Sequence, residues 1–177
     1  MKNNLKEEPI VNRVAQSSLI TFNLETLYHP GRRLLWDIKD QLYQEIILKE
    51  KDFRAFIKAH DWSEYEGYNV AITCSVDAIV PTWAYMLLAV NLNPFVHHMV
   101  FGNLEDLENS LYQKALSEID LEQYRDGKVI IKGCGSVPVP EFAYVEAVRQ
   151  LQAVAGSIMY GEPCSTVPLY KRTKSKI

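Results

Sequence analysis

The stretch DWSEYEGYNVAITCSVDAIVPTWAYMLLAVNLNPFVHHMVFG, residues 61–102, is followed 59 positions later by a similar stretch, DLEQYRDGKVIIKGCGSVPVPEFAYVEAVRQLQAVAGSIMYG, residues 120–161. Aligned without gaps, the two are identical at ten positions. Random composition would give roughly two or three identities over such a span. We interpret the similarity as a duplicated unit. The alternative is that two βαβ units share generic strand and helix residues.

Each copy of the repeat has the pattern of a strand, a helix and a second strand. A short β-branched run follows a turn with glycine, which is typical of the start of a strand. A Val-Pro pair comes next, and proline is favoured at the first position of a helix. We therefore expect these elements at 70–73, 81–92 and 99–101 in the first copy, and at 129–132, 140–154 and 158–160 in the second.

The segments outside the repeat also carry structural signals. Asn103 is a typical helix N-cap, and the residues after it predict a helix to about Ile119. Near the N-terminus, Leu19–Leu24 and Arg33–Asp37 have the composition of strands. Lys49–His60 has apolar residues at helical spacing. We expect this N-terminal part to be an elaboration on the edge of a sheet.

The order of these elements predicts the fold class. Strands that alternate with helices indicate an α/β protein with a mainly parallel sheet and helices on both faces. Two repeated βαβ units most simply give a three-layer αβα architecture with strand order 2-1-3-4, plus an N-terminal α+β elaboration. The length predicts a single domain, 1–177. Its parts are the elaboration 1–60, the first repeat 61–102, the linking helix 103–119, the second repeat 120–161 and a tail 162–177.

All three cysteines of the chain follow predicted strands. Cys74, Cys134 and Cys164 would lie at the carboxyl edge of one sheet, near the point where the strand order reverses. Two predicted helix N-termini also point at this edge and favour thiolates. We therefore expect a metal site of three cysteines for zinc or an iron–sulfur cluster, with Asp77 and Glu162 as the nearest carboxylates to complete the binding site.

Two other interpretations of the cysteines remain open. Free cysteine is often buried and only packs, which would make the protein a non-catalytic structural partner. The same thiols would also suit a thiol-dependent enzyme that acts on a small anionic ligand in the crevice. A nicotinamide or flavin site is not expected, because Pro138 stands where the Gly133-Cys134-Gly135 stretch would need a further glycine. His97 and His98 begin a strand at the opposite edge and are interpreted as surface or packing residues.

Composition excludes several classes of protein. The net charge of −3 gives no electrostatic basis for binding nucleic acid. The longest apolar stretch, 78–90, is too short to cross a bilayer, and the first residues hold no apolar run typical of a signal peptide. We therefore expect a cytoplasmic protein with reduced thiols. The helix after Pro81 is apolar nearly all round, so either residues 1–60 or a second subunit of a homodimer must cover it.

Three stretches that contain the cysteines carry a resemblance to a known family. ITCSVDAIVPTWAYMLLA, VIIKGCG and YGEPCSTVPLYKR resemble an uncharacterised bacterial family, a domain of unknown function, and the similarity runs from about Ile10 to Arg172. The family has no established activity and supplies no catalytic residues. The resemblance implies a role near iron–sulfur cluster maturation, with iron–sulfur assembly proteins as partners.

Overall fold

The computed structural model describes residues 19–133 and 135–173, which form two compact units. Within the described chain, unit 1 comprises 19–26, 119–139 without 134, and 144–173. Unit 2 comprises 27–118 and 140–143. That the two units fold together as one domain, as the chain length predicts, stays a prediction. In the described residues, no helix has both the length and the apolar character needed to cross a membrane.

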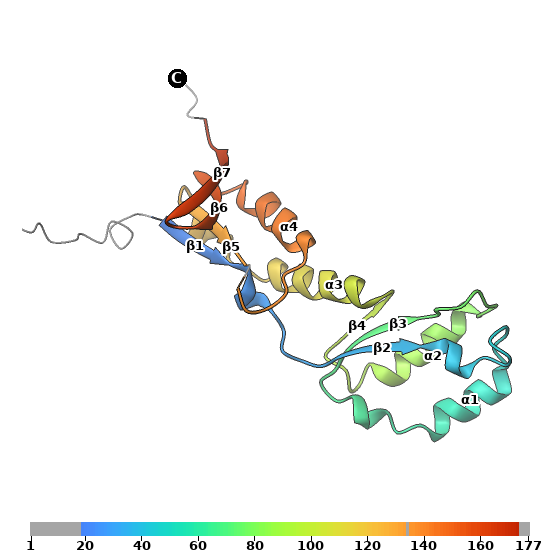
Figure 1. Ribbon diagram of the computed structural model, residues 1–177. Coiled ribbons are helices and arrows are strands. Elements are labelled where there is room, and N and C mark those ends of the chain that lie inside the picture. The colour runs from blue at the N-terminus through green and yellow to red at the C-terminus, as the bar shows by residue number, and fades with distance from the viewer. Residues whose placement is uncertain (1–18, 134, 174–177) are drawn as a thin grey trace, which may run out of the picture. The chain divides into compact units, whose positions relative to one another are not determined.

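Unit 2 is a parallel sheet with helices on both faces. Val70 and Ile72 pack with Phe53 and Leu88 on one face, whereas Ala71 packs with Leu107 on the other. The alternation of side chains along a strand thus assigns the helices to the two faces (Figure 1). The strand order is β2-β3-β4. The elements are β2 (Arg33–Asp37), α1 (Glu50–Ala59), β3 (Asn69–Thr73), α2 (Thr82–Leu92), β4 (His98–Phe101) and α3 (Leu104–Ser117).

Unit 1 is a second sheet, with strand order β1-β5-β6-β7. The first three strands are parallel, and β7 returns antiparallel to β6. On α4, the ring of Tyr144 meets that of Tyr160 on β6 edge to face, with centroids 5.8 Å apart. The elements are β1 (Leu19–Asn23), β5 (Lys128–Lys132), α4 (Glu141–Leu151), β6 (Ser157–Glu162) and β7 (Ser165–Lys171).

The spacing of 59 residues seen in the sequence recurs in the structure. β5 and α4 span the positions of β3 and α2 shifted by 59, and β6 begins 59 positions after β4. The turn before each central strand has a left-handed residue at the same place, Gly67 with φ 72° and Asp126 with φ 57°. Glycine and aspartate are among the residues that tolerate this conformation. The predicted strand–helix–strand pattern of both copies is confirmed.

The predicted strand order 2-1-3-4 is wrong. It requires β3 and β5 to be neighbours, but they lie in different sheets. The neighbouring position of each is taken by an N-terminal strand: β2 pairs with β3 from Arg33↔Asn69 onward, and β1 pairs with β5 from Leu19↔Lys128 onward. A repeat in the sequence indicates which strands are alike, but not which strands pair. The prediction of strands and a helix in the N-terminal part is confirmed, and β1 and β2 are edge strands of two separate sheets.

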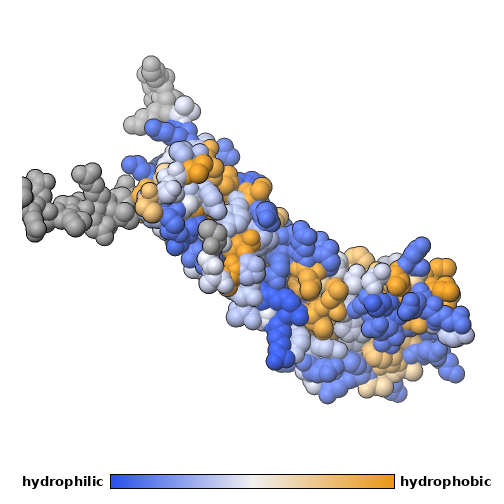
Figure 2. Space-filling model, viewed as in Figure 1, coloured by the Kyte–Doolittle hydropathy of each residue, from blue (hydrophilic) through white to orange (hydrophobic). Residues whose placement is uncertain are grey.

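Helix α2 is covered less completely than its sequence predicts. Leu88 is fully buried, and α1 packs against the same core. Met86 and Val90, however, are 64% and 69% exposed, so residues 27–60 cover only part of the helix. Figure 2 shows that apolar patches also interrupt the hydrophilic surface elsewhere. That a second subunit of a homodimer covers the exposed Met86 and Val90 stays a prediction.

Candidate functional site

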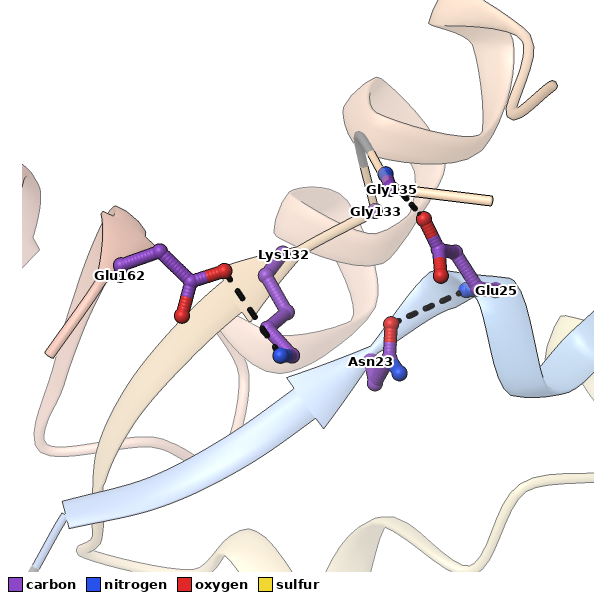
Figure 3. Close-up of a pocket in the computed structure, with 6 residues that line it drawn as sticks. All are labelled: Asn23, Glu25, Lys132, Gly133, Gly135 and Glu162. Atoms are coloured by element: carbon purple, nitrogen blue, oxygen red, sulfur yellow. Dashed lines mark hydrogen bonds and ion pairs between the residues drawn. The ribbon is translucent and has the colours of Figure 1, made fainter. Parts of the chain in front are cut away.

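A hollow in unit 1 lies at the carboxyl edge of its parallel strands (Figure 3). Asn23 is the last residue of β1, Lys132 of β5 and Glu162 of β6. Parallel strands that end at one edge bring such residues together, and this edge is where α/β proteins commonly bind ligands. Among the described residues, those that line it are Asn23, Glu25, Lys132, Gly133, Gly135 and Glu162.

The loop after β5 holds a carboxylate with its main chain. The backbone N–H groups of Gly135 and Ser136 both donate to Oε1 of Glu25, the latter at 3.1 Å, and the Ser136 hydroxyl is 3.3 Å from Oε2. Glu25 is itself placed by Asn23, whose side-chain oxygen accepts from the Glu25 N–H at 3.2 Å. Successive main-chain N–H groups that converge in this way form an anion-binding concavity.

The two glycines of this loop lie close to side chains of neighbouring elements. A Cβ at position 133 would lie 2.9 Å from the Tyr144 hydroxyl and 3.1 Å from Cβ of Leu24. A Cβ at position 135 would lie 2.7 Å from Oε1 of Glu25. Any side chain at Gly135 would thus push away the carboxylate that the loop binds.

The remaining charges of the hollow form a weak pair. Nζ of Lys132 lies 3.6 Å from Oε1 of Glu162, and these side chains are 35% and 56% exposed. An ion pair this exposed contributes little to stability. Lys132 is therefore free, at small cost, to exchange Glu162 for another anion.

Two of the predicted site residues lie at or near this hollow. Glu162 lines it, and Cys164 follows two residues later in the turn between β6 and β7, where it is exposed. Cys134 lies outside the described residues, but both of its neighbours in the sequence, Gly133 and Gly135, line the hollow.

The other two predicted site residues belong to unit 2. Cys74 follows β3, is half-buried against the core of unit 2, and donates from Sγ to the Val76 carbonyl at 3.3 Å. Burial, and then the charge and hydrogen bond of the Cys74 thiol, raise the pKa of Tyr85. Asp77 is exposed in the loop after Cys74.

The expectation that all three cysteines share one sheet edge is wrong for Cys74 and Cys164. The reason is the strand order, since β3 belongs to the sheet of unit 2 and β6 to that of unit 1. Among residues 19–133 and 135–173, no three His, Cys, Asp or Glu side chains are grouped so that they could hold a metal ion. The metal site of Cys74, Cys134 and Cys164 stays a prediction.

Sequence reasoning missed three residues of the hollow. Asn23, Glu25 and Lys132 attract no attention by residue type, because polar residues commonly end a strand. One signal was available. Each N-terminal strand ends in Asn or Asp followed by a buried aliphatic residue, Leu24 in one case and Ile38 in the other. In both places the Asn or Asp oxygen accepts a main-chain N–H two residues on.

The fold and the hollow define an α/β protein with two mostly parallel sheets and an anion-holding loop at one carboxyl edge. The chain belongs to the family described as protein of unknown function (DUF2480), which matches residues 8–172. No curated protein and no solved structure matches it.

Proposed function

We propose that the protein binds a small anionic ligand at the carboxyl edge of unit 1, in the loop that follows β5. The observation that carries the proposal is the carboxylate of Glu25, which accepts the main-chain N–H groups of both Gly135 and Ser136. A loop that holds one carboxylate has the donors to hold another oxyanion in its place. Lys132 lines the same hollow and supplies a positive charge to a ligand that enters.

We propose that the thiol of Cys134 is the reactive group at this site. Its neighbours Gly133 and Gly135 line the hollow, and N–H groups that stabilise an anion also favour a thiolate. We propose that Cys134 is the reactive residue of a thiol-dependent enzyme that acts on the bound anion. We propose that the protein is cytoplasmic, because a thiol of this kind stays reduced in the cytoplasm.

The test uses inorganic phosphate and acetate as probes. Their binding is detected by NMR through the backbone amide signals of Gly135 and Ser136. Glu25→Ala removes the resident carboxylate, so we expect either probe to shift both signals saturably and at least fivefold more tightly than in the wild type. Glu66→Ala removes an exposed carboxylate in unit 2 and serves as the matched control. Unchanged amide signals in Glu25→Ala would overturn the proposal.

A metal or iron–sulfur centre is the second candidate. It is favoured by Glu162, which lines the hollow with both neighbours of Cys134 and lies two residues before Cys164. Two thiolates and a carboxylate are common ligands for zinc, and thiolates hold iron–sulfur clusters. With Cys74 as a third ligand, the protein would be an accessory protein that carries the centre for iron–sulfur assembly proteins.

Metal and sulfide content of anaerobically purified protein tests this candidate. Cys134→Ser and Cys164→Ser should each abolish the bound metal, because so few protein ligands leave no redundancy. Cys74→Ser distinguishes the two versions, since it abolishes the metal only if all three cysteines bind it. Full metal content in Cys134→Ser or Cys164→Ser, or none in the wild type, would exclude the candidate without affecting the phosphate test.

A further inference from the structure

A second hollow, at the amino edge of the sheet of unit 2, combines two imidazoles with a lysine. It encloses about 580 Å³, part of it open to solvent, and its lining includes His29, His97, Leu111, Lys114 and Glu118. All the residues that line it belong to unit 2. None of them takes part in the site described above.

The hydrogen bonds of His29 determine where its proton sits. The backbone N–H of Gly31 is 3.2 Å from Nδ1, and Nδ2 of the fully buried Asn69 is 3.1 Å from the same atom. A backbone N–H can only donate, so Nδ1 must be the acceptor and carry no proton. The neutral ring therefore has its proton on Nε2, which makes that atom the one donor His29 has for a ligand.

Burial and neighbouring charges favour the neutral form of His29. Its ring stacks on that of His97, with centroids 3.7 Å apart and an angle of 4° between the planes. Burial lowers the pKa of His29, and the charges of His97, Arg33, Lys114 and His98 lower it further. His29 is thus held as a neutral donor with a fixed orientation.

Lys114 supplies the charge of this hollow. It lies on α3 one turn before Glu118, and no ion pair involves it within the described residues. The nearby Arg33 is already engaged, with Nε 2.6 Å and Nη2 3.0 Å from the two carboxylate oxygens of Glu108. A free ammonium and a neutral N–H donor in one hollow form a binding site for an oxyanion.

We propose that this hollow binds a small carboxylate with an apolar body. The carboxylate accepts from Nε2 of His29 and from Nζ of Lys114, and the body packs on Leu111 and Ala115. Glu118 lines the same hollow, and its negative charge disfavours ligands that carry more than one charge. The chemical class is therefore a monocarboxylate rather than a phosphate ester.

Benzoate serves as the probe. Its binding is detected by NMR through the ring nitrogen signals of His29 and the side-chain signals of Lys114. We expect saturable shifts of both. Lys114→Gln should weaken benzoate binding about tenfold, which corresponds to about 1.4 kcal/mol for one lost charge-assisted hydrogen bond. Lys58→Gln makes the same change of charge at an exposed position on α1 and should leave the affinity unchanged.

Benzyl alcohol, which has the same ring and no charge, should not saturate the site in the range where benzoate does. The proposal is overturned if Lys114→Gln weakens benzoate binding less than fivefold, if benzyl alcohol binds as well as benzoate, or if the His29 signals do not move. Lys114 lies at the rim of the hollow rather than in the core, so the variant folds and its affinity remains measurable.

Discussion

The carboxyl edges of the two units share a backbone plan but differ in the residue that holds the loop. In unit 2, Oδ1 of Asp37 at the end of β2 accepts from the N–H groups of Lys39 and Ser75, each at 3.1 Å. In unit 1, the residue at the equivalent strand position is Asn23, and the loop is held instead by Glu25. The residue that accepts the N–H groups of the loop is thus at the strand end in unit 2. In unit 1 it is Glu25, two residues beyond the strand end, whose longer side chain lines a hollow.

In unit 2, the hydrogen bonds to the loop affect the pKa of Asp37. Burial raises the pKa of Asp37, but its hydrogen bonds to Ser75 and Lys39 outweigh burial and leave the pKa below its ordinary value. Only 12% of the Asp37 side chain is exposed, so a ligand has no access to these donors. One architecture thus holds its loop with a largely buried carboxylate in unit 2 and with a carboxylate that lines a hollow in unit 1, where we propose that a ligand takes its place.

The contacts between helix and strand are more alike in the two units than the carboxyl edges are. Tyr85 meets Phe101 edge to face with centroids 5.1 Å apart, and their counterparts in the repeat, Tyr144 and Tyr160, do the same at 5.8 Å. Each pair joins a helix to the strand that follows it. The two copies of the repeat thus keep the same aromatic contact between helix and strand although their carboxyl edges differ.

The largest effect should come from the last leucine of each repeat helix. Leu92 and Leu151 occupy the same place in α2 and α4, and both are fully buried. Truncation to alanine leaves a cavity, so Leu92→Ala and Leu151→Ala should each lower the free energy of unfolding by about 2–5 kcal/mol. Denaturant titration measures both. A loss below about 1 kcal/mol in only one of them would mean that the two cores are not equivalent.

The next largest effect should come from the glycine near the end of the second strand of each repeat. Replacing it should lower stability by different amounts in the two units. Gly102 and Gly161 have φ of 141° and 119°, so alanine is strained at both positions. A Cβ at Gly161 would also meet the backbone oxygen of Ser165 at 2.5 Å, whereas at Gly102 it would meet only side-chain atoms of Asp106, the nearest carbon atoms at 2.8 and 2.9 Å. We expect losses of about 3 kcal/mol for Gly161→Ala and about 1–2 kcal/mol for Gly102→Ala.

Thermal denaturation of both variants against the wild type measures this difference. Equal losses would indicate that the β6–β7 turn shifts to relieve the contact with Ser165. The clash of backbone atoms would then not distinguish the two strand ends.

The smallest effect concerns one half-buried position that the two repeat helices share. Hydrogen bonds from Arg149 and Gln150 lower the pKa of Glu146 on α4 to about 2, whereas the equivalent position on α2 is Leu87. A carboxyl whose pKa is lower in the folded state stabilises the fold above its ordinary pKa of 4.5, and this contribution is lost as the pH falls through about 2. The wild type should therefore lose more stability over this range than Glu146→Gln.

Melting temperatures across this acid range measure the effect, with Glu141→Gln on the same helix as the control. The effect should be small, because Arg149 is 69% exposed and solvent screens the pair. Melting temperatures that fall in parallel for wild type and Glu146→Gln would show that the ion pair on α4 does not contribute measurably to stability.

Local structure was predictable from the sequence because its causes are local. Asn103 caps α3 through both its side chain and Asp106, as a capping residue followed by acidic residues predicts. The β-branched runs became β3 and β5 within one residue. The pairing of strands was not predictable, because it depends on which distant segment reaches each central strand first and packs best. LITFN and RLLWD carry no signal that distinguishes their partners.

The candidate site was predictable only in part for the same reason. Glu162 was named because a strand end marks the edge of a sheet, and it does line a hollow at the carboxyl edge of unit 1. Cys74 and Asp77 were assigned to it because both repeats were placed in one sheet. Glu25 was missed because its role depends on the pairing of β1 with β5, which brings it to a loop 110 positions away in the sequence.

The assignment of β1 and β2 to different sheets has a consequence for synthesis on the ribosome. β2 meets its partner β3 after 36 further residues, but β1 must wait 109 residues for β5. At about 5–20 residues per second, the sheet of unit 2 is complete about one to six seconds before β5 offers a partner to the first strand of unit 1. During that interval β1 is an unpaired strand on a nascent chain, which is the kind of segment that chaperones bind and that aggregates when they do not.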